Sequence, residues 1–148
     1  MHNNNNEEFC PFCEYLSGAR KCAFIRRSKT VASLVNARQY ERGAILVIPI
    51  QHGATVLDLD PQIVGAVHAE AALLGRALVR GFSATGLNIF QNNGIDAGQH
   101  VPHLHVHVVP RYPGSDPTLI YQQAHFQPVP MAEQLSVAER VREALGAT

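Results

Sequence analysis

Three histidines alternate with aliphatic residues in the run His103-Leu104-His105-Val106-His107. Successive side chains of a β-strand point to opposite faces, so this alternation places all three imidazole rings on one face and the aliphatic groups on the other. Crowded or buried imidazoles are unfavourable unless each has a partner. The pattern predicts a strand with one face in the hydrophobic core and the other lined by a functional histidine cluster. The alternative without a functional role is a polar, solvent-exposed strand face on which histidines happen to alternate.

Three other segments have the composition of β-strands. Residues 30–36 and 44–50 are rich in β-branched and aliphatic side chains, and the short polar segment between them favours a hairpin. Residues 87–91 form another such run. Together with the histidine strand, expected over residues 104–109, these segments predict an antiparallel sheet.

A long amphipathic helix is expected after the hairpin. Asp60 followed by Pro61 is a typical helix start, with an N-cap and a proline at the first helical position. Apolar side chains then recur at steps of three and four residues to about Arg80, and Gly81 is the expected stop.

A shorter helix is expected near the C-terminus. Residues 136–145 are amphipathic, and Ser136 with Glu139 forms a capping box at their start. The elements together predict an α+β fold, in which one long helix packs on an antiparallel sheet and a short C-terminal helix follows.

Composition narrows the class of protein. The 148 residues are 46% hydrophobic and 16% charged, which fits one globular domain. The formal net charge is zero, so the charge balance does not favour nucleic acid or an anionic membrane as a partner. We identified no apolar run near the roughly 20 residues of a membrane span. We therefore expect no nucleic-acid and no membrane partner.

The N-terminal residues and the cysteines indicate the cellular compartment in which the protein is expected. Residues 1–8 are polar and asparagine-rich, which predicts a disordered tail ahead of a single domain over residues 9–148. This tail lacks the apolar region of a signal peptide. Three cysteines are an odd number, and we expect reduced thiols or metal ligands rather than a disulfide framework. These features predict a cytoplasmic protein.

The histidine run also carries a resemblance. HLHVHVV, preceded by NNGIDAGQHVP and followed by PR, is similar to the signature of the histidine triad (HIT) superfamily. The likeness extends from Cys10 to about Tyr112. It implies the compact α+β HIT fold, a homodimer joined through strand and helix edges, and a nucleotide substrate with an AMP-like part.

The resemblance implies roles for individual residues. His105 would be the nucleophile that attacks an α-phosphorus and forms a covalent nucleotidyl-histidine, which water then hydrolyses. A neutral imidazole suits this role, because it is nucleophilic at pH 7 and two steps replace one difficult displacement. His107 would donate a hydrogen bond to the phosphate, and His103 would stand beside the nucleophile.

Substrate-binding residues follow from the same comparison. Asn92 and Gln99 match positions that hold the phosphate and the leaving group. Asn36 matches the residue that binds the ribose hydroxyls, where an asparagine resembles the branch that cleaves diadenosine polyphosphates. Leu34 would fall in the base pocket.

Cys10 and Cys13 form a Cys-x-x-Cys pair. Alone, such a pair could be redox-active or could be two unrelated core cysteines. The resemblance to bacterial members of the family implies a structural zinc bound by Cys10, Cys13, His52 and His103, because two thiolates and two imidazoles form a closed tetrahedral set. No organic cofactor is expected.

The sequence departs from the family pattern at two positions. Ala44 follows Gly43 where the family usually has a histidine that supports the triad, so activity or substrate choice could differ. His100 stands where a serine or threonine commonly handles the leaving group, and it could act there as a proton donor or simply face solvent.

The leading prediction is a hydrolase of nucleotidyl conjugates, such as dinucleoside polyphosphates or nucleoside phosphoramidates. Three alternatives stay open. A second substrate rather than water could accept the nucleotidyl group, which makes a nucleotidyltransferase. The chain could be a nucleotide-binding regulatory protein with weak catalysis. The three triad histidines could also hold a catalytic metal.

Overall fold

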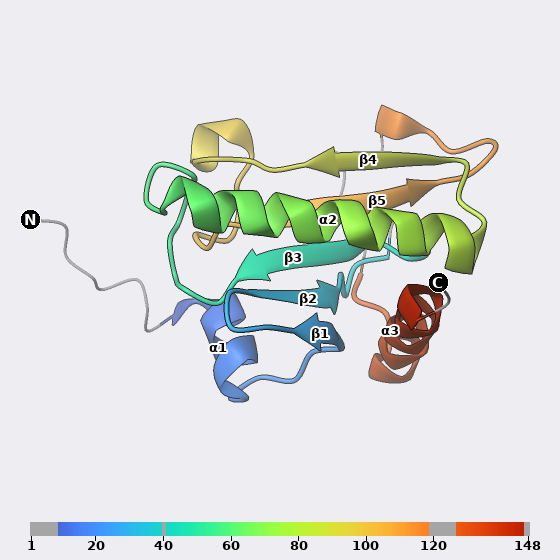
Figure 1. Ribbon diagram of the computed structural model, residues 1–148, viewed down its shortest axis with the longest axis horizontal. Helices are drawn as coiled ribbons and strands as arrows, with labels where there is room; N and C mark the ends of the chain where they lie inside the picture. Colours follow the sequence, from blue (N-terminus) through green and yellow to red (C-terminus); the bar gives the residue numbers. More distant parts are fainter. Residues whose placement is uncertain (1–8, 40, 119–126, 147–148) are drawn as a thin grey trace, which may run out of the picture.

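The computed structural model describes residues 9–39, 41–118 and 127–146, so the predicted tail over residues 1–8 lies outside the described residues. Five strands form one antiparallel sheet in the order β1-β2-β3-β5-β4 (Figure 1). The strands are β1 Phe24–Arg27, β2 Val31–Val35, β3 Ile45–Pro49, β4 Gly86–Phe90 and β5 Val106–Arg111. The α+β class and the β2–β3 hairpin are confirmed. Strand β1 was not predicted.

Helix α2, Pro61–Phe82, covers one face of the sheet (Figure 1). The Asp60 side chain accepts a hydrogen bond of 2.7 Å from the Gln62 backbone N–H, which confirms the predicted cap. The stop at Gly81 was wrong, because the helix continues to Phe82 and Ser83 takes the left-handed cap conformation. Gly81 serves packing instead, since a Cβ atom there would lie 3.1 Å from the Ala144 side chain.

By length and composition alone, α2 could cross a membrane, with 22 residues and a mean hydropathy of 1.2. The expectation that no apolar run approaches that length was therefore wrong. In the structure these apolar side chains pack inside the protein, and Val67, Leu74 and Leu78 are fully buried in the core. The apolar composition of α2 is that of a core helix.

Helix α3, Met131–Gly146, begins five residues earlier than predicted. Ser136 lies inside the helix and does not cap it. The first turn begins after Pro130, whose carbonyl accepts the Gln134 N–H at 3.1 Å. Val137, Ala138 and Val141 are buried with residues of α2, so α3 completes the core beside it.

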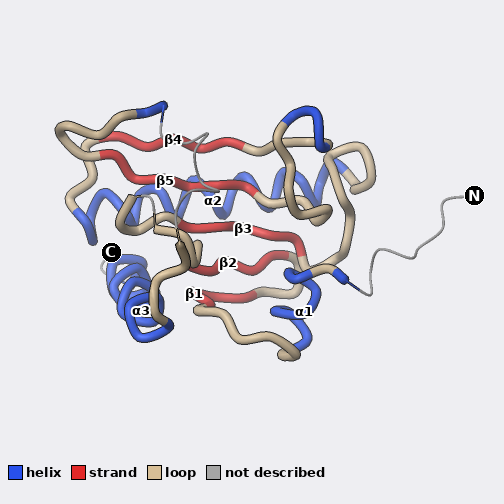
Figure 2. Tube along the Cα trace, turned by 180° about the vertical axis from the view of Figure 1, so that it is seen from behind, coloured by secondary structure: helices blue, strands red, loops and turns tan. Residues whose placement is uncertain are grey.

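The two faces of the sheet differ. Leu104, Val106 and Val108 belong to the core cluster that α2 covers, as the alternation predicted. The opposite face, seen in Figure 2, carries helix α1, Pro11–Ser17, beside the ends of β1 and β2. Strand β5 begins at Val106, two residues later than predicted, and the preceding histidines lie in a loop that continues its course. His103, His105 and His107 therefore lie on the face of the sheet opposite α2.

Candidate active site

His105 and His107 lie next to each other, with ring centroids 5.0 Å apart. The sheet register places Phe90 of β4 opposite His107 on one side and Leu46 of β3 on the other. The Phe90 and His107 rings are stacked, with centroids 4.4 Å apart and planes inclined by 6°. The neighbouring strands thus fix the plane of the His107 ring.

One hydrogen bond sets the chemistry of His105. Its Nδ1 lies 2.8 Å from the backbone carbonyl oxygen of His103. A carbonyl oxygen can only accept, so Nδ1 carries the proton and donates it. Burial, opposed by this backbone hydrogen bond, lowers the pKa of His105, so the ring is neutral at pH 7. The lone pair of a neutral ring with a protonated Nδ1 is on Nε2, and the ring lines a pocket.

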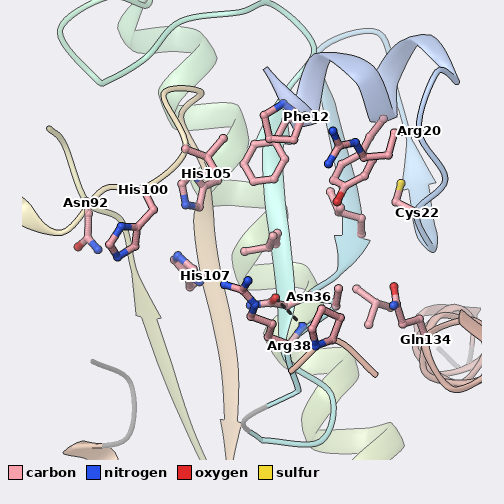
Figure 3. A pocket seen from close by; sticks show the side chains of 18 of the residues that line it. Phe12, Arg20, Cys22, Asn36, Arg38, Asn92, His100, His105, His107 and Gln134 are labelled. Carbon is pink, nitrogen blue, oxygen red and sulfur yellow. Dashed lines mark hydrogen bonds between the residues drawn. The ribbon is translucent and has the colours of Figure 1, made fainter. Parts of the chain in front are cut away.

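The pocket has a volume of about 660 Å³ (Figure 3). His105 and His107 line it together with four of the predicted substrate-binding residues, Leu34, Asn36, Asn92 and His100. Figure 3 shows Asn92 and His100 on one side of the two histidines and Asn36 on the other. The fold therefore brings residues from three separate stretches of the chain into one cavity.

Asn36 is held at the end of the hairpin. Its backbone N–H donates to the Ala44 carbonyl at 2.9 Å, and its side-chain oxygen accepts the Arg38 N–H at 3.1 Å. Gln39, which the sequence reasoning did not single out, donates to the carbonyls of Asn36 and Ala44 at 2.7 and 2.9 Å. Ala44 is fully buried. Gln39 thus fixes the backbone on which Asn36 stands.

Gln99 was predicted to bind the substrate, but it is not among the residues that line the pocket. It is buried, its side-chain oxygen accepts the Gly94 N–H at 2.7 Å, and its amide donates to the Ala54 and Val101 carbonyls at 2.6 and 2.9 Å. This side chain ties together the loop that carries His100. Its role in substrate binding stays a prediction.

His103 also lies outside the pocket lining and instead belongs to a cluster with Cys10, Cys13 and His52, whose ligand atoms all lie within 4.8 Å of one another. The His103 Nδ1 is 3.4 Å from Cys10 Sγ, 3.5 Å from Cys13 Sγ and 3.1 Å from His52 Nδ1. Tetrahedral zinc–sulfur and zinc–nitrogen bonds place ligand atoms roughly 3.3–3.8 Å apart. The donor set is that of a structural zinc site, and the separations from His103 Nδ1 come close to this range.

The orientation of the His103 ring supports the same conclusion. Its Nε2 donates to the Pro49 carbonyl at 2.9 Å, which leaves the lone pair on Nδ1, the atom that faces the cysteines. Burial lowers the pKa of His103 to about 4, so the ring is neutral and able to ligate. A histidine that was expected beside the nucleophile thus also joins the strand to the N-terminal helix.

Phe12 connects the cysteine cluster to His105. It lies between Cys10 and Cys13 in sequence, and its ring meets those of His103 and His105 edge-on, with centroids 5.7 and 5.1 Å away. It also lines the pocket. Neither Phe12 nor Phe90 was predicted, because a single aromatic residue in a sequence carries no sign of the ring it will contact.

With this geometry in place, the chain can be compared with known proteins. The HIT domain family matches residues 18–114. The chain is 28% identical over 102 residues to the adenylylsulfatase HINT3 of Arabidopsis thaliana, covering 69% of this chain and 52% of that protein. It is 34% identical over 99 residues to an asymmetrical bis(5'-nucleosyl)-tetraphosphatase of Schizosaccharomyces pombe, covering 66% of this chain and 54% of that protein. The chain therefore spans about half the length of these relatives.

Among solved structures, the fold is similar to that of a Zn-bound histidine triad family protein from Mycobacterium smegmatis. The two chains are 29% identical, each is covered to 95%, and the TM-score is 0.80. The family match, the fold and the histidine run agree, and the chain belongs to the HIT family.

The burial of His107 predicts how stability depends on pH. Burial, followed by the charge of His105, lowers the pKa of His107 to about 3. Below pH 6.5 the unfolded chain binds a proton that the folded state does not, so the free energy of unfolding falls as the pH falls. One such histidine contributes a loss of about 2 kcal/mol between pH 7 and pH 5.

The variant His107→Gln should lack that contribution. Urea unfolding of both proteins at pH 7 and pH 5 measures the difference. An equally large loss of stability between the two pH values in the variant would show that His107 titrates alike in the folded and unfolded states.

Proposed function

We propose that this protein hydrolyses nucleotidyl conjugates at the α-phosphate through a covalent nucleotidyl-histidine on His105. The observation that carries the proposal is the hydrogen bond from His105 Nδ1 to the His103 carbonyl, because it leaves Nε2 as the nucleophilic atom. The names of two relatives, an adenylylsulfatase and a bis(5'-nucleosyl)-tetraphosphatase, support a substrate with a bond to a nucleotide phosphate.

The reaction has two displacements. In the first, the Nε2 lone pair of His105 forms a bond to the α-phosphorus, and the bond to the leaving group breaks and its electron pair departs with that group. The ring becomes cationic, and the hydrogen bond to the His103 carbonyl stabilises this charge. In the second, a water oxygen bonds to phosphorus and its proton passes to solvent, while the phosphorus–nitrogen bond breaks and its electron pair returns to Nε2.

Other pocket residues have assigned tasks. We assign Asn92 and His107 to donate hydrogen bonds to phosphate oxygens and the exposed His100 to give a proton to the leaving group, and all three line the pocket. Asn36 would bind the ribose hydroxyls. Leu34 and Phe12 would enclose the base.

Substitution of the nucleophile tests the proposal. The protein is mixed with diadenosine tetraphosphate and, separately, with an adenosine phosphoramidate, and its intact mass is followed over time. A nucleotidyl adduct and turnover are expected in the unchanged protein, and both should disappear in His105→Asn, with turnover falling by at least about 10³-fold.

Two outcomes would contradict the hydrolase. Binding of AMP without adduct or turnover would favour a regulatory role, and transfer of the nucleotidyl group to an added acceptor in preference to water would favour a transferase. His68→Asn, an exposed histidine on α2, is the matched control.

We infer that the Cys10, Cys13, His52 and His103 cluster binds one structural zinc ion. The donor set fits, and the relative from Mycobacterium smegmatis is described as Zn-bound. Bound zinc would hold the cysteines and histidines at fixed separations. It would thereby keep α1, and with it Phe12, against His105.

Removal of a ligand tests the zinc proposal. Metal analysis should find one zinc per chain in the unchanged protein and little in Cys10→Ser. That variant should also unfold at lower urea concentration, because structural zinc contributes to folding free energy. Cys22→Ser, outside the cluster, should keep its zinc. A full complement of zinc in Cys10→Ser, or none in the unchanged protein, would contradict the assignment.

We also infer a homodimer built on α2 and β4. Strand β4 is an edge strand within the described sheet, and its residue Ile89, on the side of the sheet that faces α2, is 42% exposed. Leu73 and Val79 of α2 are exposed as well, at 44% and 46%. The strand edge and these apolar side chains together form a surface that a second copy could cover.

Light scattering on a sizing column tests the dimer. The unchanged protein should have the mass of two chains. Val79→Glu should lower the measured mass toward that of one chain, because the substitution would bury a charge in the interface. Leu135→Glu changes an exposed leucine on α3 and should leave the mass unchanged. A monomer at micromolar concentration, or equal behaviour of the two variants, would contradict the dimer.

A further inference from the structure

The lining of the pocket carries three basic side chains besides its histidines. Arg20, Lys21 and Arg38 line it, and no aspartate or glutamate is among the described residues of the lining. We call these three residues the basic wall. His105 and His107, which also line the pocket, are buried and neutral. The positive charge of the pocket therefore comes from the basic wall and not from these two histidines.

Two separate segments place the basic wall. Arg20 and Lys21 lie in the connection between α1 and β1, and Arg38 lies in the loop that follows β2. Burial raises the pKa of Tyr15, Cys22 and Glu14 add to this shift, and the charges of Arg20 and Arg38 oppose it. Tyr15 lines the pocket too. Arg20, Arg38 and the phenol hydroxyl of Tyr15 thus belong to one region of the pocket.

Much of this charge is available to a ligand. Arg20 pairs with Glu14 at 2.7 Å, in an exposed ion pair of low strength. Among the described residues, neither Lys21 nor Arg38 takes part in an ion pair. Two uncompensated cations match the charge of about −1.5 to −2 on a phosphomonoester.

The position of Arg38 indicates which part of a nucleotide carries that phosphate. Its backbone N–H is bound by the side chain of Asn36, the residue assigned to the ribose hydroxyls. Figure 3 shows Asn36 and Arg38 on one side of the histidines, whereas Asn92 and His100 lie on the opposite side. The leaving group belongs to that opposite side.

We propose that the basic wall binds a second phosphate, carried on the 2′ or 3′ hydroxyl of the ribose, so that the preferred substrates are conjugates of nucleoside bisphosphates. This rests on the proposed function, because it takes the nucleotide to lie with its ribose at Asn36. Arg38 and Lys21 donate charge-assisted hydrogen bonds to the extra phosphate, and the Tyr15 hydroxyl donates a third.

Binding of four nucleotides tests this inference. Calorimetry compares AMP with adenosine 2′,5′-bisphosphate, adenosine 3′,5′-bisphosphate and ADP, whose second phosphate extends toward the leaving-group side. At least one bisphosphate should bind about tenfold or more tightly than AMP, and added salt should reduce this preference. The affinity of ADP should exceed that of AMP by a smaller factor. An equal gain for ADP, or no gain for either bisphosphate, would overturn the assignment.

Variants locate the preference. Arg38→Gln and Lys21→Gln should each remove most of the ratio between bisphosphate and AMP affinities. Arg76→Gln, which changes an exposed arginine of α2 outside the pocket, should retain it. A ratio unaltered in both wall variants would overturn the inference. Failure of AMP itself to bind would overturn the proposed function together with this inference, whereas AMP binding without a bisphosphate preference would overturn this inference alone.

Discussion

The hydrogen bond from the His105 ring to the His103 carbonyl is the interaction on which the site depends. It lies in the segment just before β5, where the ring of residue 105 reaches the carbonyl two positions earlier. The same stretch turns the His103 ring away, toward the cysteines. One short segment therefore fixes the tautomer of His105 with its backbone and directs the His103 ring toward the cysteines with its side chain.

Helix α1 links the cysteine cluster to the pocket. Cys10 caps this helix, with its sulfur accepting the Cys13 N–H at 3.4 Å, and Phe12 between them contacts both histidine rings. Phe12 and Tyr15 also form part of the pocket wall. A metal that fixes the two cysteines would thus influence the shape of the pocket through Phe12 and Tyr15.

The sequence predicted those parts of the structure that repeat a local pattern. Alternation placed Leu104 and Val106 in the core, and the Asp60-Pro61 pair marked the start of α2. It predicted α3 but not its start, because Ser136 offers the same capping chemistry inside a helix as at its beginning, and the burial of Gln134 in the folded protein cannot be read from the segment alone. Gln99 was assigned to the substrate, yet a loop carbonyl competes for the same amide. Ring contacts such as Phe90 on His107 depend on strand register, which no single segment contains.

The central claim is that His105 presents an unprotonated Nε2 to the pocket, and nuclear magnetic resonance tests it most directly. In protein labelled with nitrogen-15 at histidine, the ring nitrogens of His105 are assigned by comparison with His105→Asn and observed at pH 7. The structure predicts a neutral ring with the proton on Nδ1 and a bare Nε2. A ring protonated on Nε2, or on both nitrogens, would contradict the account of the nucleophile.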